Sequence, residues 1–436
     1  MSSLRRFHGA WVENRPSRRV ARRCRIGVER LEGRRVPAVL SVGPAETYTL
    51  PSQAAAAAHD GDVISIDAGT YRGDVAVWTA NNLTIQGVGG RAVIDDTGAD
   101  IPNRKAIWVI SGDNTTVQNV ELTGAHDPTG ADANWAGIRQ EGANLTLLGS
   151  YIHDNDEGLL TGANPASDIT VKSTEFAFNG YGDGYSHNIY VGQVRSFTLE
   201  FSSSHDAAIG HLVKSRAETN RILYNRLTDG ANGTSSYALD LPNGGASYVI
   251  GNVIEKGPKS DNSTSLSYAE EGASNAVQEL YVVNNAFVND LGGGTFVAVG
   301  GTPADVRLVN NIFAGGGTVL SGPGTLTTNL VSDDPVFVDR AGYDYHLVAS
   351  SPAIDAGTNP GTVNGVALTP VYQYTGLSGV ARPVKGALDI GAFEYSTNVL
   401  RSVAVTPANP STLIGGHMPF TATATYSDGT SQDVTS

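Results

Sequence analysis

A short pattern that returns along the middle of the chain constrains the fold most. An apolar, strand-like run followed by one small polar residue recurs at steps of 24, 28, 23, 27, 33 and 26 residues. Such steps are too long for a single hairpin and suit one coil of a parallel β-solenoid. We therefore expect residues 45–395 to form about ten coils. The repeated polar residues are Ser150, Thr174, Ser202, Asn225, Asn252, Asn285 and Asn311.

Asparagine at the repeated turn has a physical reason. It tolerates left-handed backbone angles, and its amide can both donate to and accept from the neighbouring coil. The Val, Ile, Leu and Tyr residues before it suit strands that stack their inward faces at about 4.8 Å per coil. The sequence therefore predicts one ladder, formed by Asn225, Asn252, Asn285 and Asn311.

A second column of strands fixes which side chains face outward. Its segments are "GIRQEG", "GLLTGA", "NIYVGQ", "HLVKSR" and "ALDLPN". Alternation along a strand places residues beside each inward apolar position on the outer face. The predicted inward column is Ile138, Leu159, Ile189, Leu212 and Leu239, and the predicted outward residues are Asn188, His211, Arg139, Tyr190 and Asp240.

Composition agrees with a long solenoid. The chain has 52 glycines and only 17% charged residues, against roughly 25% in an average globular protein. The single Cys24 excludes an internal disulfide. Residues 1–40 hold 11 arginines and 3 glutamates, so the rest of the chain has 18 basic and 40 acidic residues, a net charge of −22. That field repels nucleic acid, although a local basic groove could bind an acidic glycan.

The basic arm, residues 1–40, has no apolar run long enough for an ordinary signal peptide or a membrane helix. It reads as a disordered tail. Its segment "VERLEGRRVPAVL" (28–40) nevertheless resembles an N-terminal "LExR…PA" segment that some bacteria place on large exported surface proteins. The resemblance implies an export-associated arm.

The next segment, "TYTLPSQAAAAAHDGDVISIDAGTYRGDVAVWTANNLTIQGVGGRAVID" (47–95), resembles the opening of right-handed parallel β-helix proteins of the pectate-lyase-like superfamily. Helix propensity predicts a short helix at Ala54–Ala58 that covers the open end of the first coil. The segments "SPAIDAGTN" (351–359) and "DIGAFEY" (389–395) are similar to the terminal segment of many secreted bacterial β-helix proteins. There Phe393 and Tyr395 are expected to cap the last coil, and the β-helix is expected to span residues 41–396.

The pattern changes after Asn398. "LRSVAVTPANPSTLIGGHMPFTATATYSDGTSQDVTS" resembles the first half of a bacterial Ig-like domain of group 2, with strands at "SVAVTP" and "FTATATYSDG". Residues 397–436 are too few for a sandwich of about 100 residues. Such modules usually serve outside the cell, so the resemblance implies an extracellular or cell-surface protein.

Residues with chemical capability concentrate between 183 and 243. The pectate-lyase-like superfamily hosts lyases, hydrolases, epimerases and non-enzymes. β-Elimination of a uronate needs a cation for the carboxylate, a base for the C5 proton and an acid for the leaving oxygen. Arg216 could clamp the carboxylate, and His211 or Lys214 could take the proton, although strict alternation would point Lys214 inward. The full set has Tyr190, His187, His211 and Lys214 as catalytic candidates, and Arg139, Asn188, Arg216, Asp240 and Asn243 as substrate-binding candidates.

Two other functions stay open at this point. "AIGHLVKSR" resembles the Gly-His segment of β-helical polygalacturonases, but the second glycine is absent and no pair of aspartates shares its strand column. A non-catalytic surface protein that binds glycan fits the acidic body equally well. For Arg216, Asp240 and Asn243 a purely structural alternative is also open, a ladder of salt bridges and hydrogen bonds that holds irregular loops.

No cofactor is certain from the sequence. "HDNDEG" could supply calcium ligands from Asp154, Asp156 and Glu157, although it lacks EF-hand spacing. The expected partner is an extracellular polysaccharide, with no nucleic acid and no membrane-spanning segment, and the protein is expected to be a monomer.

Overall fold

The computed structural model describes residues 36–130, 134–396, 400–407, 419–426 and 431–435. The chain separates into two units, Met1–Val36 and Pro37–Ser436. Most of the predicted basic arm thus lies outside the described residues. Its last two positions, Val39 and Leu40, already belong to the first strand, β1 (Val39–Val42).

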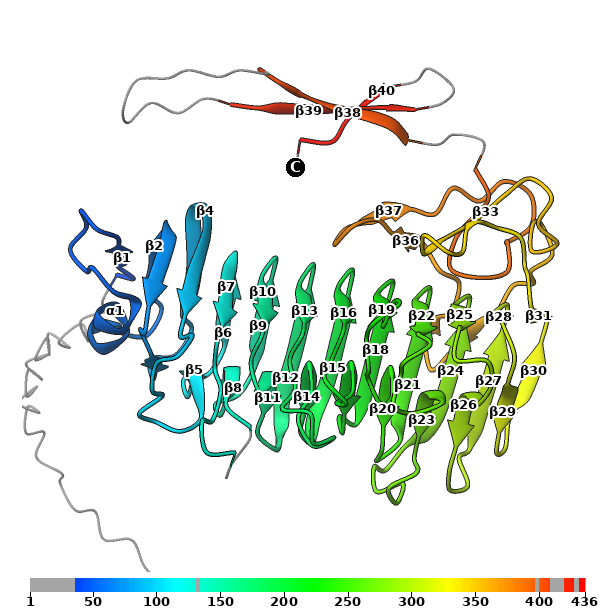
Figure 1. Cartoon of the computed structure of the whole chain (residues 1–436), viewed down its shortest axis with the longest axis horizontal. Helices are drawn as coiled ribbons and strands as arrows, with labels where there is room; N and C mark the ends of the chain where they lie inside the picture. Colours follow the sequence, from blue (N-terminus) through cyan, green and yellow to red (C-terminus); the bar gives the residue numbers. More distant parts are fainter. Residues whose placement is uncertain (1–35, 131–133, 397–399, 408–418, 427–430, 436) are drawn as a thin grey trace, which may run out of the picture. The chain divides into compact units, whose positions relative to one another are not determined.

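The fold is a right-handed parallel β-helix of about ten coils, as predicted (Figure 1). Each coil adds one strand to a ten-stranded sheet, whose members pair in parallel with the preceding and following coils. These strands are β3 (Ala76–Trp78), β5 (Ala106–Ile110), β8 (Ala136–Gln140), β11 (Glu157–Thr161), β14 (Ile189–Val191), β17 (Val213–Ser215), β20 (Leu239–Leu241), β23 (Thr264–Tyr268), β26 (Thr295–Val299) and β29 (Thr318–Ser321).

The other walls of the solenoid belong to one 21-stranded sheet that bends at the repeated polar residues. Before the bend lie β1, β2 (Val63–Arg72), β4 (Thr84–Asp95), β6 (Thr115–Gln118), β9 (Leu145–Leu148), β12 (Asn164–Lys172), β15 (Val194–Glu200), β18 (Thr219–Leu223), β21 (Gly245–Ile250), β24 (Gln278–Val283), β27 (Asp305–Val309) and β30 (Thr325–Thr327). After the bend lie β7 (Val120–Thr123), β10 (Tyr151–His153), β13 (Glu175–Ala177), β16 (Ser203–His205), β19 (Arg226–Thr228), β22 (Val253–Lys256), β25 (Ala286–Asn289), β28 (Ile312–Ala314) and β31 (Leu330–Ser332), and the long strands β2 and β4 span both parts.

The predicted asparagine ladder is present and buried. The Asn225 backbone N–H donates to Asn252 Oδ1 at 2.8 Å, and Asn252 donates in the same way to Asn285 at 2.8 Å. Asn285 continues to Asn311 at 2.9 Å, and the ladder extends to Asn329. One expectation about this turn is wrong. The left-handed backbone angle belongs to the residue before each asparagine, as at Tyr224 with φ 56°, which leaves the asparagine extended so that its amide points into the next coil.

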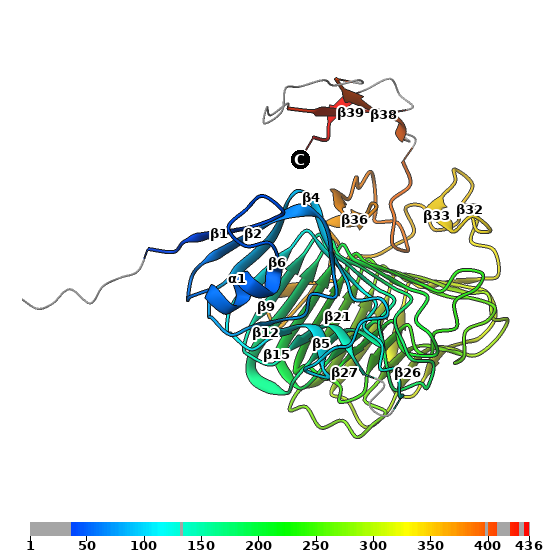
Figure 2. The same ribbon diagram turned by 60° about the vertical axis from the view of Figure 1, so that its left-hand side comes forward.

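The predicted N-terminal helix is α1 (Pro51–Ala57), which begins at a proline. Ala54 and Ala55 are buried in the core beside the first strands. Figure 2, in which the N-terminal coils come forward, shows α1 next to β1 and β2. The helix therefore covers apolar residues of the first coil, as a cap must.

The segment 333–395, called here the lateral segment, packs on the side of the solenoid. It holds three short antiparallel pairs, β32 (Phe337–Asp339) with β33 (Asp344–Leu347), β34 (Thr362–Val363) with β35 (Val366–Ala367), and β36 (Tyr372–Tyr374) with β37 (Gly379–Ala381). Phe393 packs with outward residues of β22, β25 and β28, among them Val253 and Ile312.

The expected cap over the last coil is therefore wrong in its position. Leu326 stacks on Leu308 at the end of the inner apolar column and is 54% exposed. The lateral segment instead docks through the Asn284 side chain, which donates to the Asp389 carbonyl at 2.8 Å, and through Gly391 N–H, which donates to the Asn310 carbonyl at 2.8 Å. Apolar outward residues on β22 to β28 explain this docking, because without it they would face water.

Near the C-terminus, β38 (Leu400–Thr406), β39 (Thr421–Tyr426) and β40 (Ser431–Asp433) form an antiparallel sheet. Strands thus lie where the alternating segments predicted them. Within the described part of the chain, no helix has the length and apolarity that a membrane crossing needs.

Candidate functional site

The candidate site lies on the outer face of the ten-stranded sheet, where β14, β17 and β20 run side by side. Tyr190 pairs in register with Lys214, and Lys214 pairs with Asp240. All three side chains share one outward column across three coils. Arg139 belongs to the same column two coils earlier, but Leu160 separates it from Tyr190. Arg139 lies 3.5 Å from Glu141 and does not join the cluster.

The expected register of β17 is wrong by one residue. Val213, not Leu212, continues the inward column, because Val213 pairs with Leu239. Both Leu212 and Val213 are fully buried, so two apolar residues in succession gave alternation no means to choose between them. Lys214 therefore points outward, whereas strict alternation from Leu212 predicted that it points inward.

His187 and His211 stack on each other next to this column. Their ring centroids are 4.4 Å apart with planes 10° apart, and His211, expected above Asn188, lies above His187 instead. The His211 backbone N–H donates to His187 Nδ1 at 3.0 Å, and the Tyr237 N–H donates to His211 Nδ1 at 3.3 Å. Each Nδ1 is an acceptor, so the proton of each neutral ring lies on Nε2.

The two histidines are neutral at ordinary pH. Burial, with the nearby charges of Lys214 and Arg216, lowers the pKa of His187 to about 3. Burial and the neighbouring His187 and Lys214 lower the pKa of His211 to about 2. Its Nε2 lies 3.6 Å from Asp240 Oδ2. His211 is thus placed as a neutral donor toward Asp240, which argues against its expected role as the base.

Arg216 connects the neighbouring coils. Its Nε donates to the Tyr190 hydroxyl at 3.0 Å, and its Nη1 donates to Asn243 Oδ1 at 2.5 Å. The expected contact between Arg216 and Asn243 is therefore present. Because the Tyr190 oxygen accepts from Arg216, the hydroxyl hydrogen of Tyr190 stays available for another acceptor.

Sequence reasoning missed Glu271, which completes the cluster. Glu271 Oε1 lies 3.0 Å from Lys214 Nζ, and its Oε2 accepts from Arg216 Nη2 at 2.6 Å. Lys214 also lies 3.2 Å from Asp240 Oδ2. The step of 27 residues from Arg216 to Asn243 leads on to Glu270, the neighbour of the residue that makes the contact. The repeat could thus have pointed to this loop but not to the right glutamate.

The two carboxylates of the cluster have different environments. Burial raises the pKa of Asp240, although Lys214 opposes this shift. Partial burial alone would raise the pKa of Glu271, but hydrogen bonds from Arg216 and Lys214 outweigh it and lower that pKa. The cluster therefore holds two cations and two carboxylates with separated proton affinities.

Asn188 does not belong to the outward set. Its side chain is fully buried, where its Oδ1 accepts from Asn179 at 2.9 Å and its Nδ2 donates to Ser204 Oγ at 3.0 Å. It is a rung of an internal amide ladder. The expectation that Asn188 binds substrate is therefore wrong in its geometry.

The calcium candidates do not converge. Asp156 Oδ1 lies 2.9 Å from His126 Nδ1, and Asp154 Oδ2 lies 2.6 Å from His153 Nδ1. Glu157 is fully buried, burial holds its pKa well above the usual range, and it accepts the backbone N–H of His187 at 3.0 Å. Within the described ranges, no group of three or more His, Cys, Asp or Glu side chains is placed to hold a metal ion. These residues do not fit a calcium site.

Comparison with solved structures agrees with the fold. A pectate lyase, Pel9A, shares 15% identity, with a TM-score of 0.57 over 84% of this chain and 98% of that chain. An alginate lyase from Paenibacillus sp. shares 16% identity, with a TM-score of 0.34 over 68% of this chain and 99% of that one. A pectin methylesterase from Erwinia chrysanthemi shares 11%, with a TM-score of 0.35 over 62% and 90%. No protein-family model and no curated protein matches the chain.

Proposed function

We propose that this protein binds an acidic polysaccharide along the outer face of the ten-stranded sheet and cleaves it by β-elimination. The observation that carries the proposal is the outward column of Tyr190, Lys214 and Asp240, which Arg216 joins from the end of the strand that carries Lys214. Adjacent coils lie about 4.8 Å apart. One sugar ring can thus contact side chains from more than one coil.

In the proposed reaction, Arg216 and Lys214 bind the uronate carboxylate, which makes the C5 proton more acidic. Lys214 passes one proton to Asp240, whose oxygen lies 3.2 Å away, and its amine then takes the C5 proton as the C4–O4 bond breaks and a C4=C5 double bond forms. Tyr190 gives its hydroxyl proton to the departing O4 oxygen. His211 and Glu157 are positioning residues here, because His211 faces Asp240 and Glu157 holds the His187 backbone. The resemblance to a pectate lyase fold is in keeping with this chemistry.

A direct test is to incubate the full chain with polygalacturonate, alginate and other uronate polymers and to follow ultraviolet absorbance from unsaturated ends. Arg216→Lys should lower kcat/KM by about tenfold or more, because an ammonium cannot donate in a bidentate manner. Tyr190→Phe should lower kcat while KM stays within about twofold. Arg195→Lys is the matched control, because Arg195 pairs with Asp168 on a different sheet.

Two outcomes favour other functions. Retained glycan binding without any cleavage product would indicate a non-catalytic surface protein, outside the cell as the terminal resemblances imply. New reducing ends without ultraviolet absorbance would indicate a hydrolase. One observation favours the hydrolase as second candidate. Asp240 and Glu271 both reach Lys214, and burial raises the pKa of Asp240 whereas hydrogen bonds from Arg216 and Lys214 lower the pKa of Glu271.

A further inference from the structure

The two cations of the site already have a carboxylate between them. Lys214 Nζ and Arg216 Nη2 lie 3.0 Å and 2.6 Å from the two oxygens of Glu271. This is the arrangement in which a free carboxylate would be bound. Glu271 lies in the loop between β23 and β24, one coil beyond Asp240.

A charge count shows the consequence for an acidic ligand. Lys214 and Arg216 face Asp240 and Glu271, and the two stacked histidines are neutral. An incoming uronate would find both cations neutralised. Binding of its carboxylate therefore requires that one protein carboxylate leaves.

Only one of the two carboxylates is free to leave. The Asp240 side chain is 3% exposed and lies on β20 in register with Lys214. The Glu271 side chain is 48% exposed and lies on a loop. Exposed ion pairs contribute little net free energy, because water and salt screen them. Displacement of Glu271 therefore costs much less than displacement of Asp240.

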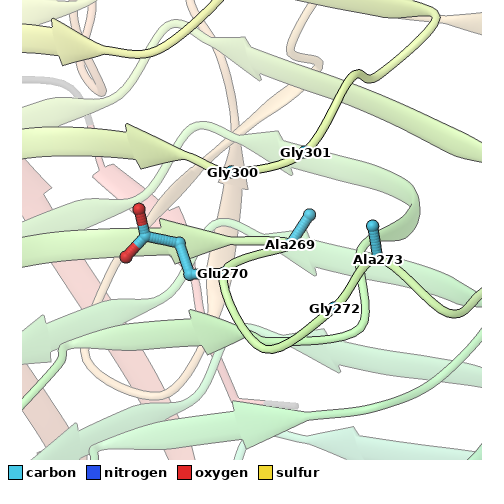
Figure 3. A pocket seen from close by; sticks show the side chains of 6 residues that line it. All are labelled: Ala269, Glu270, Gly272, Ala273, Gly300 and Gly301. Atoms are coloured by element: carbon cyan, nitrogen blue, oxygen red, sulfur yellow. The ribbon is translucent and has the colours of Figure 1, made fainter.

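The loop that carries Glu271 has room to move. A cavity of about 540 Å³ lies beside it. It is lined by the residues labelled in Figure 3, Ala269, Glu270, Gly272, Ala273, Gly300 and Gly301. Ala269 and Ala273 hold left-handed φ values of 59° and 46°, conformations that cost free energy for a residue other than glycine.

The ends of the loop are tied down. Ala269 N–H donates to the Leu241 carbonyl at 2.9 Å, and the Asn275 side chain donates to the Ala217 carbonyl at 2.9 Å. Between them, the Glu271 backbone N–H donates to the Pro242 carbonyl at 3.1 Å, a bond that must break when the backbone moves. The motion required is therefore local to residues 270–274.

We propose that Glu271 is a specificity-determining residue. Its carboxylate occupies the position on Lys214 and Arg216 where the substrate carboxylate binds, until an acidic sugar displaces it toward the cavity. This inference rests on the proposed function. A neutral or methyl-esterified sugar cannot displace Glu271, because it offers the cations no replacement charge. Glu271 thereby selects for free uronate, at the cost of a weaker apparent affinity in the resting state.

The test uses Glu271→Gln in the full chain, with Glu270→Gln as the matched control, since Glu270 borders the cavity and the cations bind its neighbour instead. Isothermal titration with oligogalacturonate and oligomannuronate should give an apparent Kd about three- to tenfold lower for E271Q. E270Q should stay within about twofold of the wild type. Methyl-esterified oligogalacturonate should show no gain with either variant. Weaker binding of both acidic probes by E271Q, or lost turnover with unchanged binding, overturns the proposal.

A second measurement separates this inference from the proposed function. Amide hydrogen exchange of residues 270–274, without any glycan, should be several-fold faster in E271Q than in the wild type and unchanged in E270Q. Unchanged exchange in E271Q shows that Glu271 does not hold the loop, and the displacement is then refuted even if glycans bind. Faster exchange together with no binding of any acidic probe by any variant refutes the proposed function, and with it the displacement.

Discussion

Replacement of Asn252 by leucine is the sharpest test of what holds the coils together. Asn252 Oδ1 accepts from both the backbone N–H and the side-chain Nδ2 of Asn225, at 2.8 Å and 3.0 Å. Its own Nδ2 donates to the Ile222 carbonyl at 2.7 Å. The site is completely buried, so no water can take over these bonds when the amide is removed.

The size of the effect follows from the partners that stay behind. Leucine has nearly the same shape as asparagine but leaves the Asn225 N–H and the Ile222 carbonyl without these partners. A buried polar group that loses its hydrogen bond costs about 1–3 kcal/mol, so Asn252→Leu should lower the free energy of unfolding by about 2–6 kcal/mol. Asn329 is the control, because it ends the ladder and is only partly buried. Asn329→Leu should cost less than about 1.5 kcal/mol, because the freed groups can bind water.

Urea unfolding of both variants, followed by circular dichroism, measures the difference. The ladder argument fails if the two substitutions cost the same, or if Asn252→Leu costs less than about 1 kcal/mol. Asn252→Asp distinguishes shape from hydrogen bonding, because it keeps the acceptor oxygen and loses the donor. Its cost should include a buried charge as well, so it should be least stable at high pH.

Three further predictions concern buried charges. Burial, with the charges of Asp100, Asp95 and Asp74, raises the pKa of Asp96 from 3.8 to about 6. Stability should therefore fall as pH rises between these two values and stay lower above them, so Asp96→Asn should raise the urea midpoint at pH 8 but not at pH 4. Burial alone would lower the pKa of His205, but Asp206 and Glu175 raise it to about 9. The stabilisation from the charged His205 is fully present below about pH 6.5 and should be lost as pH rises through about 9. His205→Gln should flatten that part of the stability profile. Arg382 and Glu394 form a buried pair at 2.6 Å, so Glu394→Gln should lower the thermal midpoint more than Asp339→Asn on the surface, and equal shifts would contradict the role of the pair.

The fold could be predicted because one interaction repeats. Successive coils present a small polar residue at the same turn, so Ser202, Asn225, Asn252 and Asn285 reveal the number of residues in each coil. The outward column could be predicted only in part. Alternation identified Tyr190 and Asp240 as outward residues. It could not decide which residue of β17 faces inward, because the adjacent Leu212 and Val213 are both apolar and both buried.

The rest of the site depends on loops, whose residues do not recur at a fixed spacing from coil to coil. Glu271 reaches Lys214 from a loop whose path is set by left-handed angles at Ala269 and Ala273, and alanine gives no signal for such angles. His211 was expected on the surface, yet it is 6% exposed and packs against the rings of both His187 and Tyr237. His211→Ala should therefore cost stability as well as activity. Thermal midpoints must accompany any kinetic measurement at this position.

The lateral segment also affects when folding can be completed during synthesis. Its residues follow every coil in the sequence, yet Ile390 and Phe393 pack on outward residues of β22 and β28, such as Val253 and Ile312. During synthesis these strands emerge first, and their apolar flank stays exposed to water until about 140 more residues after Val253 of β22, and about 80 after Ile312 of β28, have been made. Each coil otherwise contacts only its neighbours, so the solenoid could open from its far end one coil at a time. Contacts between residues more than 100 positions apart, such as Asn284 with Asp389, hold the lateral segment on these coils. A chain that lacks the segment leaves their apolar flank uncovered, which favours aggregation.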